Sequence, residues 1–216
     1  MSATKATVEF EVSFAILAVG LLNAVIFTSL SNWNNATSFI LPSIPFTLAV
    51  YVIYLIASTA CILFKQKKWL SIVFKLLLSF MTLHVIANLL VLFAFPNSTA
   101  SDARTILIDA FMLWGSGVLV FSLWYWVIDR DGPVQRMLER DETRYDLLFP
   151  QYQTKIAGWA EWKPRFLDYI FFSFFTSTGF SPADTLPLTK RIKFLMMIEA
   201  TTSLITISMV ISRALT

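Results

Sequence analysis

The fold of this chain is decided by the stretch DYIFFSFFTSTGFSPAD, residues 168–184. The run from Asp168 to Thr178 is apolar for only about ten residues, too few for a helix to cross the roughly 30 Å of a bilayer core. Hydroxyl, glycine and proline residues follow at once. Such backbone is stable at membrane depth only where other protein or a water-filled cavity satisfies its polar groups. The stretch therefore predicts a re-entrant element, a short helix followed by a returning loop.

The rest of the chain consists largely of apolar segments of membrane-spanning length. Of its 216 residues, 56% are hydrophobic and 14% are charged, whereas about a quarter of the residues in a soluble domain are charged. Apolar runs predict spans at 12–30, 44–64, 69–95 and 105–128, and a final span from about Phe194 to Arg213. The composition excludes an ordinary cytosolic enzyme, and we expect an all-α, multi-pass integral membrane protein.

Charge is concentrated in one part of the chain. Of the 31 formal charges, 15 lie between Asp129 and Asp168. The periodicity of 133–149 predicts an interfacial amphipathic helix, with a solvated helix packed on the protein's own polar end as the alternative. We therefore divide the chain into a three-span region, 1–104, and a module, 105–216, with a polar linker at 129–167. Basic residues lie at the ends of apolar segments, so nucleic-acid binding is not indicated.

Several polar residues lie inside predicted spans, where burial of an ionisable group is costly and marks a functional hypothesis. His84 and Asp109 form a possible proton relay of a transporter, and the alternative is that both make hydrogen bonds between helices. Gly115 and Gly117 predict close helix packing. Cys61 is the only cysteine and His84 the only histidine, so neither a catalytic site nor a metal site is expected.

At residues 168–189 the sequence resembles the pore module of the potassium-channel superfamily, in which a re-entrant helix leads into a Thr-Val-Gly-Tyr-Gly-Asp filter and an inner helix. Residues 168–175 match the pore helix, 176–180 the start of the filter, Asp184 the acidic residue after it, and 186–189 the Pro-x-Thr pattern before the inner helix, 190–213. Small bacterial multi-pass proteins with a channel-like C-terminus are similar too, since they carry one glutamate and a late arginine, matched by Glu199 and Arg213.

The resemblance implies a homotetramer in the bacterial inner membrane, surrounded by lipid, through which K⁺ or another monovalent cation passes without any other cofactor. The ion pathway that it implies is formed by Thr176, Ser177, Thr178, Gly179, Phe180, Ser181 and Asp184. It places Glu199 behind the filter, in a position to support Ser173, Thr176 or Ser177. A protonated or hydrogen-bonded glutamate that ties two helices together is the alternative.

The chain departs from the channel pattern in the outer filter. Ser181 replaces the second filter glycine, and Pro182 and Ala183 are extra residues before Asp184. A filter selects by successive cages of backbone carbonyls, so we expect passive cation permeation with weak or undetectable selectivity. A channel-fold scaffold or sensor that does not conduct is one alternative, and a small proton-coupled transporter is the other.

The orientation in the membrane stays open at this point. Loops at 31–43 and 96–103 contain no Lys or Arg, whereas 65–68 and the polar linker are rich in them, so the positive-inside rule makes the linker cytoplasmic. The channel resemblance implies the opposite, because the segment between outer helix and pore helix lies outside in channels.

Overall fold

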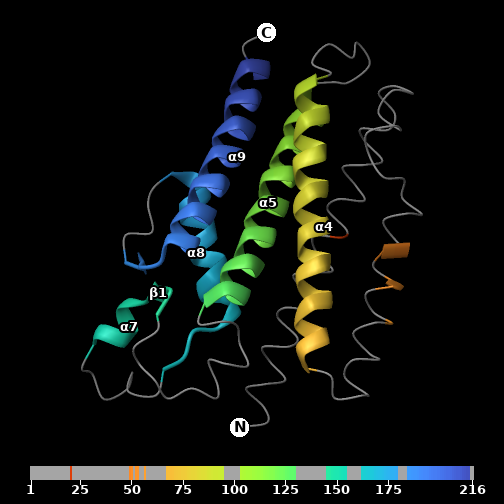
Figure 1. Ribbon diagram of the computed structural model, residues 1–216. Helices are drawn as coiled ribbons and strands as arrows, with labels where there is room; N and C mark the ends of the chain where they lie inside the picture. Colours follow the sequence, from red (N-terminus) through yellow and green to blue (C-terminus); the bar gives the residue numbers. More distant parts are fainter. Residues whose placement is uncertain are drawn as a thin grey trace. The chain divides into compact units, whose positions relative to one another are not determined.

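The structure, a computed structural model, describes residues 20, 49–50, 52–53, 56, 67–94, 103–129, 145–154, 162–179 and 184–214. Its elements in chain order are α4 (Lys67–Ala94), α5 (Ala103–Ile128), β1 (Leu147–Leu148), α7 (Pro150–Gln153), α8 (Phe166–Thr178), β2 (Leu186–Pro187) and α9 (Lys190–Ala214) (Figure 1). Helix accounts for 84% of the residues that can be interpreted, which confirms the all-α prediction. The predicted span at 12–30 and most of that at 44–64 lie outside the described residues.

Three of the described helices are long and apolar enough to cross a membrane. These segments are Ile72–Leu90, Leu107–Ile128 and Lys190–Met209, with 19, 22 and 20 residues. At 1.5 Å per residue each of them rises about 30 Å, the thickness of the hydrocarbon layer. They coincide with the third, fourth and final predicted spans, as expected of a multi-pass membrane protein.

The sequence explains where α4 ends and which of its faces is exposed. The helix stops at Ala94, two residues before Pro96, which has no backbone N–H and disfavours helix in the residue before it. Leu76, Leu83 and Leu90 recur every seven residues and are exposed, which places them on one face. In a bilayer this leucine face would contact lipid tails.

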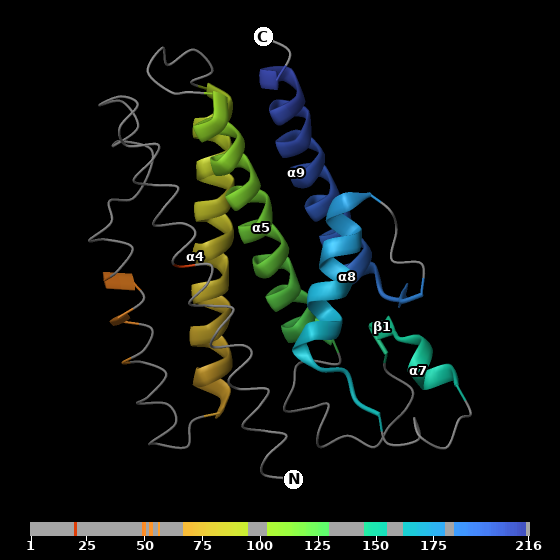
Figure 2. The same cartoon turned by 180° about the vertical axis from the view of Figure 1, so that it is seen from behind.

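The chain divides into two compact units, with one boundary between Ser116 and Gly117 in α5 and another between Ile207 and Ser208 in α9. One unit holds α4 and the first part of α5, which run side by side (Figures 1 and 2). The second unit holds the remainder of α5, β1, α7, α8, β2 and α9 as far as Ile207. Figure 2 shows α8 lying alongside both α5 and α9 in this second unit. The site described below lies wholly within it.

An aromatic core holds the second unit together. It consists of buried side chains from α5, α8, α9 and the segment around β1: Phe121, Tyr125, Leu147, Phe149, Tyr169, Phe172 and Ile192. The rings of Tyr125 and Phe172 meet edge to face at 4.8 Å, and those of Phe149 and Tyr169 at 5.5 Å. Each such pair adds about 0.5–1.5 kcal/mol to the stabilisation from burial. The core thus fixes α8 against the end of α5.

The segment from α8 to β2 begins and ends near the C-terminal end of α5. The hydroxyl of Tyr169, in the first turn of α8, donates to Asp129 Oδ2 at 2.6 Å, directly after α5. β1 is held at the same place, because the Leu147 N–H donates to Asp129 Oδ1 at 3.2 Å. β2 pairs antiparallel with β1, with Leu186 opposite Leu148. The chain therefore leaves this end along α8 and is back at it by β2.

The predicted amphipathic helix is wrong over its last residues. Residues 133–144 lie outside the described part, and residues 145–149 are not helical. Leu147 and Leu148 form β1 instead, because β2 and Asp129 satisfy their backbone better than an isolated helical turn would. Phe149 precedes Pro150 and is extended, with φ −79° and ψ 145°, as proline favours in the residue before it.

The predicted role of two α5 glycines in close helix packing is not seen either. A Cβ atom built at Gly115 or at Gly117 would meet no atom within 4 Å. Neither glycine therefore permits a close approach of backbone in the described structure.

Candidate functional site

The site is built around α8, whose start and end are both explained by local sequence. At its start the Arg165 N–H donates to Asp168 Oδ2 at 2.6 Å, so the carboxylate satisfies one of the unpaired donors before the helix. At its end Gly179 has φ 74° and ψ 3°, a left-handed conformation that glycine adopts without strain. The helix has 13 residues and is about 20 Å long, which is too short to span a bilayer.

The predicted filter residues at the tip of α8 are helical up to Thr178. Their hydroxyls donate to carbonyls of the preceding turn: Thr176 to Phe172 O at 2.9 Å, Ser177 to Phe174 O at 2.9 Å, and Thr178 to Phe174 O and Phe175 O at 3.1 Å each. The Gly179 N–H donates to Thr176 O at 3.3 Å. The backbone of 176–178 therefore forms the last turn of a helix within this chain and not an extended strand of outward-facing carbonyls.

The other predicted pathway residues are only partly described. Asp184 is exposed, just before β2. Phe180 and Ser181 lie outside the described residues. α9 begins at Lys190, the residue at which the resemblance places the start of an inner helix.

A buried polar cluster joins the middle of α8 to both neighbouring helices. Ser173 Oγ lies 2.8 Å from Val118 O of α5 and also makes a hydrogen bond with Glu199 Oε1 of α9. The Tyr125 hydroxyl donates to Glu199 Oε2 at 2.6 Å. The side chains of Tyr125, Ser173 and Glu199 are fully buried. Three helices thus meet at one carboxyl group.

The structure brings Glu199 to one of the three partners expected for it, Ser173. The hydroxyls of the other two, Thr176 and Ser177, are bonded to α8 itself. Tyr125 was not expected in the cluster, because its position beside two tryptophans predicts an interfacial aromatic. 

A second polar network lies in the second unit, at the end where α8 and α9 begin. Asp146 accepts two hydrogen bonds from the Arg191 guanidinium, at 2.8 and 2.6 Å, and one from the Thr189 hydroxyl at 2.7 Å. Its backbone carbonyl accepts from the Leu188 N–H at 2.9 Å. The carboxylate is buried, while Arg191 is half exposed. Asp146 therefore fastens the segment before β1 to the first turn of α9.

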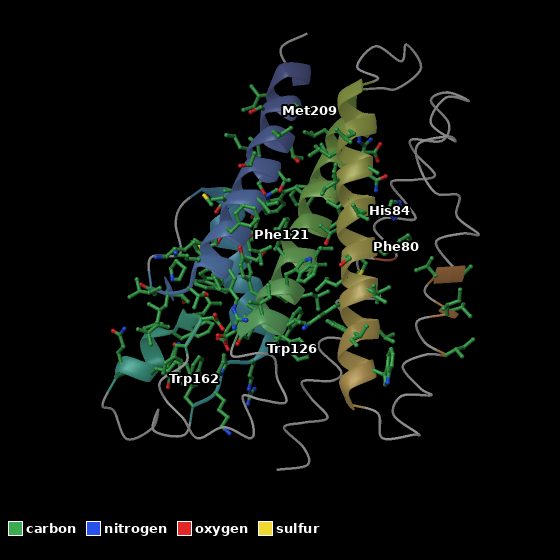
Figure 3. The ribbon with its side chains drawn as sticks, in the orientation of Figure 1. Phe80, His84, Phe121, Trp126, Trp162 and Met209 are labelled. Carbon is green, nitrogen blue, oxygen red and sulfur yellow. The ribbon has the colours of Figure 1, made fainter. Side chains whose placement is uncertain are left out.

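Sequence reasoning missed Asp129 and Asp146, because both stand in a stretch rich in acids and nothing local distinguishes them. For Asp129 the sequence does hold one indication, because it lies directly after a predicted span. A carboxylate that is buried at such a position needs a hydrogen-bond partner. Trp162 lies at the α7 end of the unit (Figure 3), with its ring 5.3 Å from that of Tyr152.

His84 and Asp109 lie in the other unit, and both are buried. His84 and Phe80 project from the same side of α4 (Figure 3), with ring centroids 6.1 Å apart. His84 Nε2 has no hydrogen-bond partner in the described part of the chain, Asp109 included. The expected relay is therefore not formed as a direct hydrogen bond through this nitrogen.

Among the described residues, no group of three or more His, Cys, Asp or Glu side chains is placed to hold a metal ion. Comparison of the chain with protein-family models, with characterised proteins and with solved structures finds no match. Function is therefore inferred from the geometry of the second unit.

Proposed function

We propose that this protein is a potassium-channel-like membrane protein whose C-terminal module carries monovalent cations passively across the bilayer with weak selectivity. The observation that carries the proposal is the placement of α8 and β2. α8 leaves the end of α5 along a helix too short to span, and β2 lies back at that end before α9 begins. A short helix with its return segment between two spanning helices is the topology that a re-entrant pore element requires.

The depth of the α8 tip supports the same function. Val118, which contacts Ser173, lies ten residues before Ile128, or about 15 Å along α5, which is half the thickness of the hydrocarbon layer. Gly179 lies six residues beyond Ser173 along α8, about 9 Å deeper. In a bilayer the tip would thus reach the middle of the membrane or beyond.

The chemistry of the tip favours a cation. The C-terminal end of a helix carries a partial negative charge of about half an elementary charge, and α8 ends there without a basic residue in its last turn. Three successive hydroxyl residues, 176–178, add oxygen lone pairs. We propose that tips from four chains converge on one axis, because a ring of oxygen ligands around an ion needs several chains.

A non-conducting channel-fold scaffold is the second candidate, and one observation favours it. Residues 176–178 are helical, and their hydroxyls are engaged with carbonyls of α8. A tip in this conformation offers few free ligands to an ion. The proton-coupled transporter gains no such support, since His84 Nε2 lacks a partner in the described residues.

Ion flux from liposomes that contain the purified protein tests the proposal. We expect a cation leak that differs little between K⁺ and Na⁺ and that is lost in Gly179→Ala, because alanine is strained at φ 74°. Gly115→Ala is the matched control and should leak like the unmodified protein, since its Cβ would meet no atom within 4 Å. Absence of flux from well-folded protein would favour the scaffold. Strong K⁺ selectivity would show that the outer filter is complete despite Ser181.

Labelling decides the orientation. A single cysteine at position 144, in a Cys61→Ala background, is exposed to an impermeant reagent from either side of the membrane. If the protein is oriented as channels are, the cysteine should be labelled from the outer side of the membrane. Labelling from the cytoplasmic side alone would contradict an outward-facing pore mouth.

A further inference from the structure

We infer that Glu199 binds a proton in this structure, and that this proton is required for Ser173 to bond to Val118 of α5 and to Glu199 of α9 at the same time. The inference rests on a count of hydrogens in the cluster around Ser173. It does not depend on conduction, because it uses only the contacts within one chain.

Three hydrogen-bonding contacts involve Ser173 or Glu199, and the Tyr125 hydroxyl also contacts the hydroxyl of Thr176. Ser173 Oγ contacts Val118 O at 2.8 Å and Glu199 Oε1, and Tyr125 Oη contacts Glu199 Oε2 at 2.6 Å. Each contact needs one hydrogen between its two oxygens. The hydroxyls of Ser173 and Tyr125 supply two, and the Val118 carbonyl supplies none. The third hydrogen can only come from the carboxyl group of Glu199.

The direction of each bond then follows. Tyr125 donates to Glu199 Oε2, the protonated Glu199 Oε1 donates to Ser173 Oγ, and Ser173 donates to Val118 O. Ser173 thereby uses its hydroxyl as donor and acceptor, so every polar atom of the cluster is satisfied. An ionised Glu199 would leave Ser173 with one hydrogen between two acceptors, and the unsupplied contact would be repulsive.

The surroundings also suit a neutral acid. Glu199 is fully buried, and of the described titratable or charged side chains only Tyr125 contacts it. The nearest described cation along α9 is Lys193, six residues earlier and about 9 Å away by helix rise, and it is exposed. Arg191 is farther away and is paired with Asp146. A buried carboxylate without a cationic partner is costly, so the proton-bound form is the stable one here.

Loss of the proton has a defined structural consequence. With two hydrogens left for three contacts, Ser173 would turn its hydroxyl to the charged carboxylate, because hydrogen bonds to ionised acceptors are the stronger ones. Val118 O would then lose its donor. The Ser173–Val118 hydrogen bond between α8 and α5 would break, while the Ser173–Glu199 hydrogen bond between α8 and α9 would persist. The proton on Glu199 therefore controls one of the contacts between α8 and α5.

The test uses Glu199→Gln, which mimics the proton-bound form. The glutamine amide donates to Ser173 and its carbonyl accepts from Tyr125, so the variant should fold and keep the same unfolding midpoint at acidic pH. At alkaline pH the midpoint of the unmodified protein should fall while that of Glu199→Gln stays, since only the unmodified protein has a proton to lose at this site. Asp184→Asn, at an exposed acid, is the control and should follow the unmodified protein.

Infrared spectroscopy reads the proton directly. The purified protein at neutral pH should show the C=O band of a protonated carboxylic acid, and this band should be lost in Glu199→Gln and kept in Asp184→Asn. An infrared spectrum without that difference would overturn the inference. An equal fall in the unfolding midpoints of the unmodified protein and of Glu199→Gln at alkaline pH would overturn the claim that this proton maintains the Ser173–Val118 hydrogen bond. Both measurements work on detergent-solubilised protein, so a failure of ion flux would leave them unaffected.

Discussion

Replacing Asp146 by asparagine should destabilise the second unit substantially. The Asp146 side chain is only 3% exposed and accepts two hydrogen bonds from Arg191 and one from Thr189. Asparagine keeps the shape but loses the charge, and its NH₂ group faces one of the guanidinium donors. A hydrogen bond to a charged group contributes about 1.5–3 kcal/mol, and we discount this because Arg191 is 48% exposed. We expect a loss of about 2–4 kcal/mol in the free energy of unfolding.

Thr189→Val provides the internal scale for this prediction. It removes one neutral donor, at 2.7 Å from Asp146 Oδ1, and should cost about 1 kcal/mol. The free energies come from unfolding in mixed micelles of increasing denaturing detergent, followed by tryptophan fluorescence. Asp184→Asn is the matched control and should change stability by less than about 0.5 kcal/mol. The reasoning is refuted if Asp146→Asn is as stable as the control, or if Thr189→Val costs more than Asp146→Asn.

Three further substitutions should each change the free energy of unfolding in a defined direction in the same assay. Tyr169→Phe removes the donor at 2.6 Å from Asp129 Oδ2 and should cost about 1–3 kcal/mol, because the buried carboxylate loses a hydrogen bond that water does not replace. Gly179→Ala should cost about 1 kcal/mol, since its strain is conformational and no atom lies within 4 Å of the new Cβ. Gly115→Ala should instead stabilise by up to about 1 kcal/mol, because it replaces a helical glycine without a clash. A stabilising Gly179→Ala would show that the helix end can relax out of the left-handed conformation.

Hydropathy and proline placement predicted the long helices well. The expected spans at 69–95 and 105–128 correspond to α4, Lys67–Ala94, and α5, Ala103–Ile128, with ends that differ by at most two residues. These features are local, because the length of an apolar run and the proline after it act on the same few turns. The short helix α8 was predicted for the same reason, since Asp168 and Gly179 are start and end signals that stand beside it in the chain.

Local periodicity failed where distant residues compete for the backbone. The pattern of 133–149 favours a helix, yet Leu147 and Leu148 pair with β2, about 40 residues later, and Leu147 binds Asp129. No pattern within residues 133–149 indicates that β2 and Asp129 will bind this backbone. Strand pairing of this kind is decided by which segments the helices bring together.

By itself, the sequence determined that the chain is helical, that several helices are long enough to span a membrane, and that α8 is too short to do so. It also marked Glu199 as an ionisable residue in an apolar helix. Only the tertiary structure decided that Glu199 meets Tyr125, which is 74 positions away in the chain, together with Ser173. The reason is physical: apolar length is a property of each helix alone, whereas a hydrogen bond between helices depends on how each is rotated and how deep it sits, and packing of the whole unit sets both.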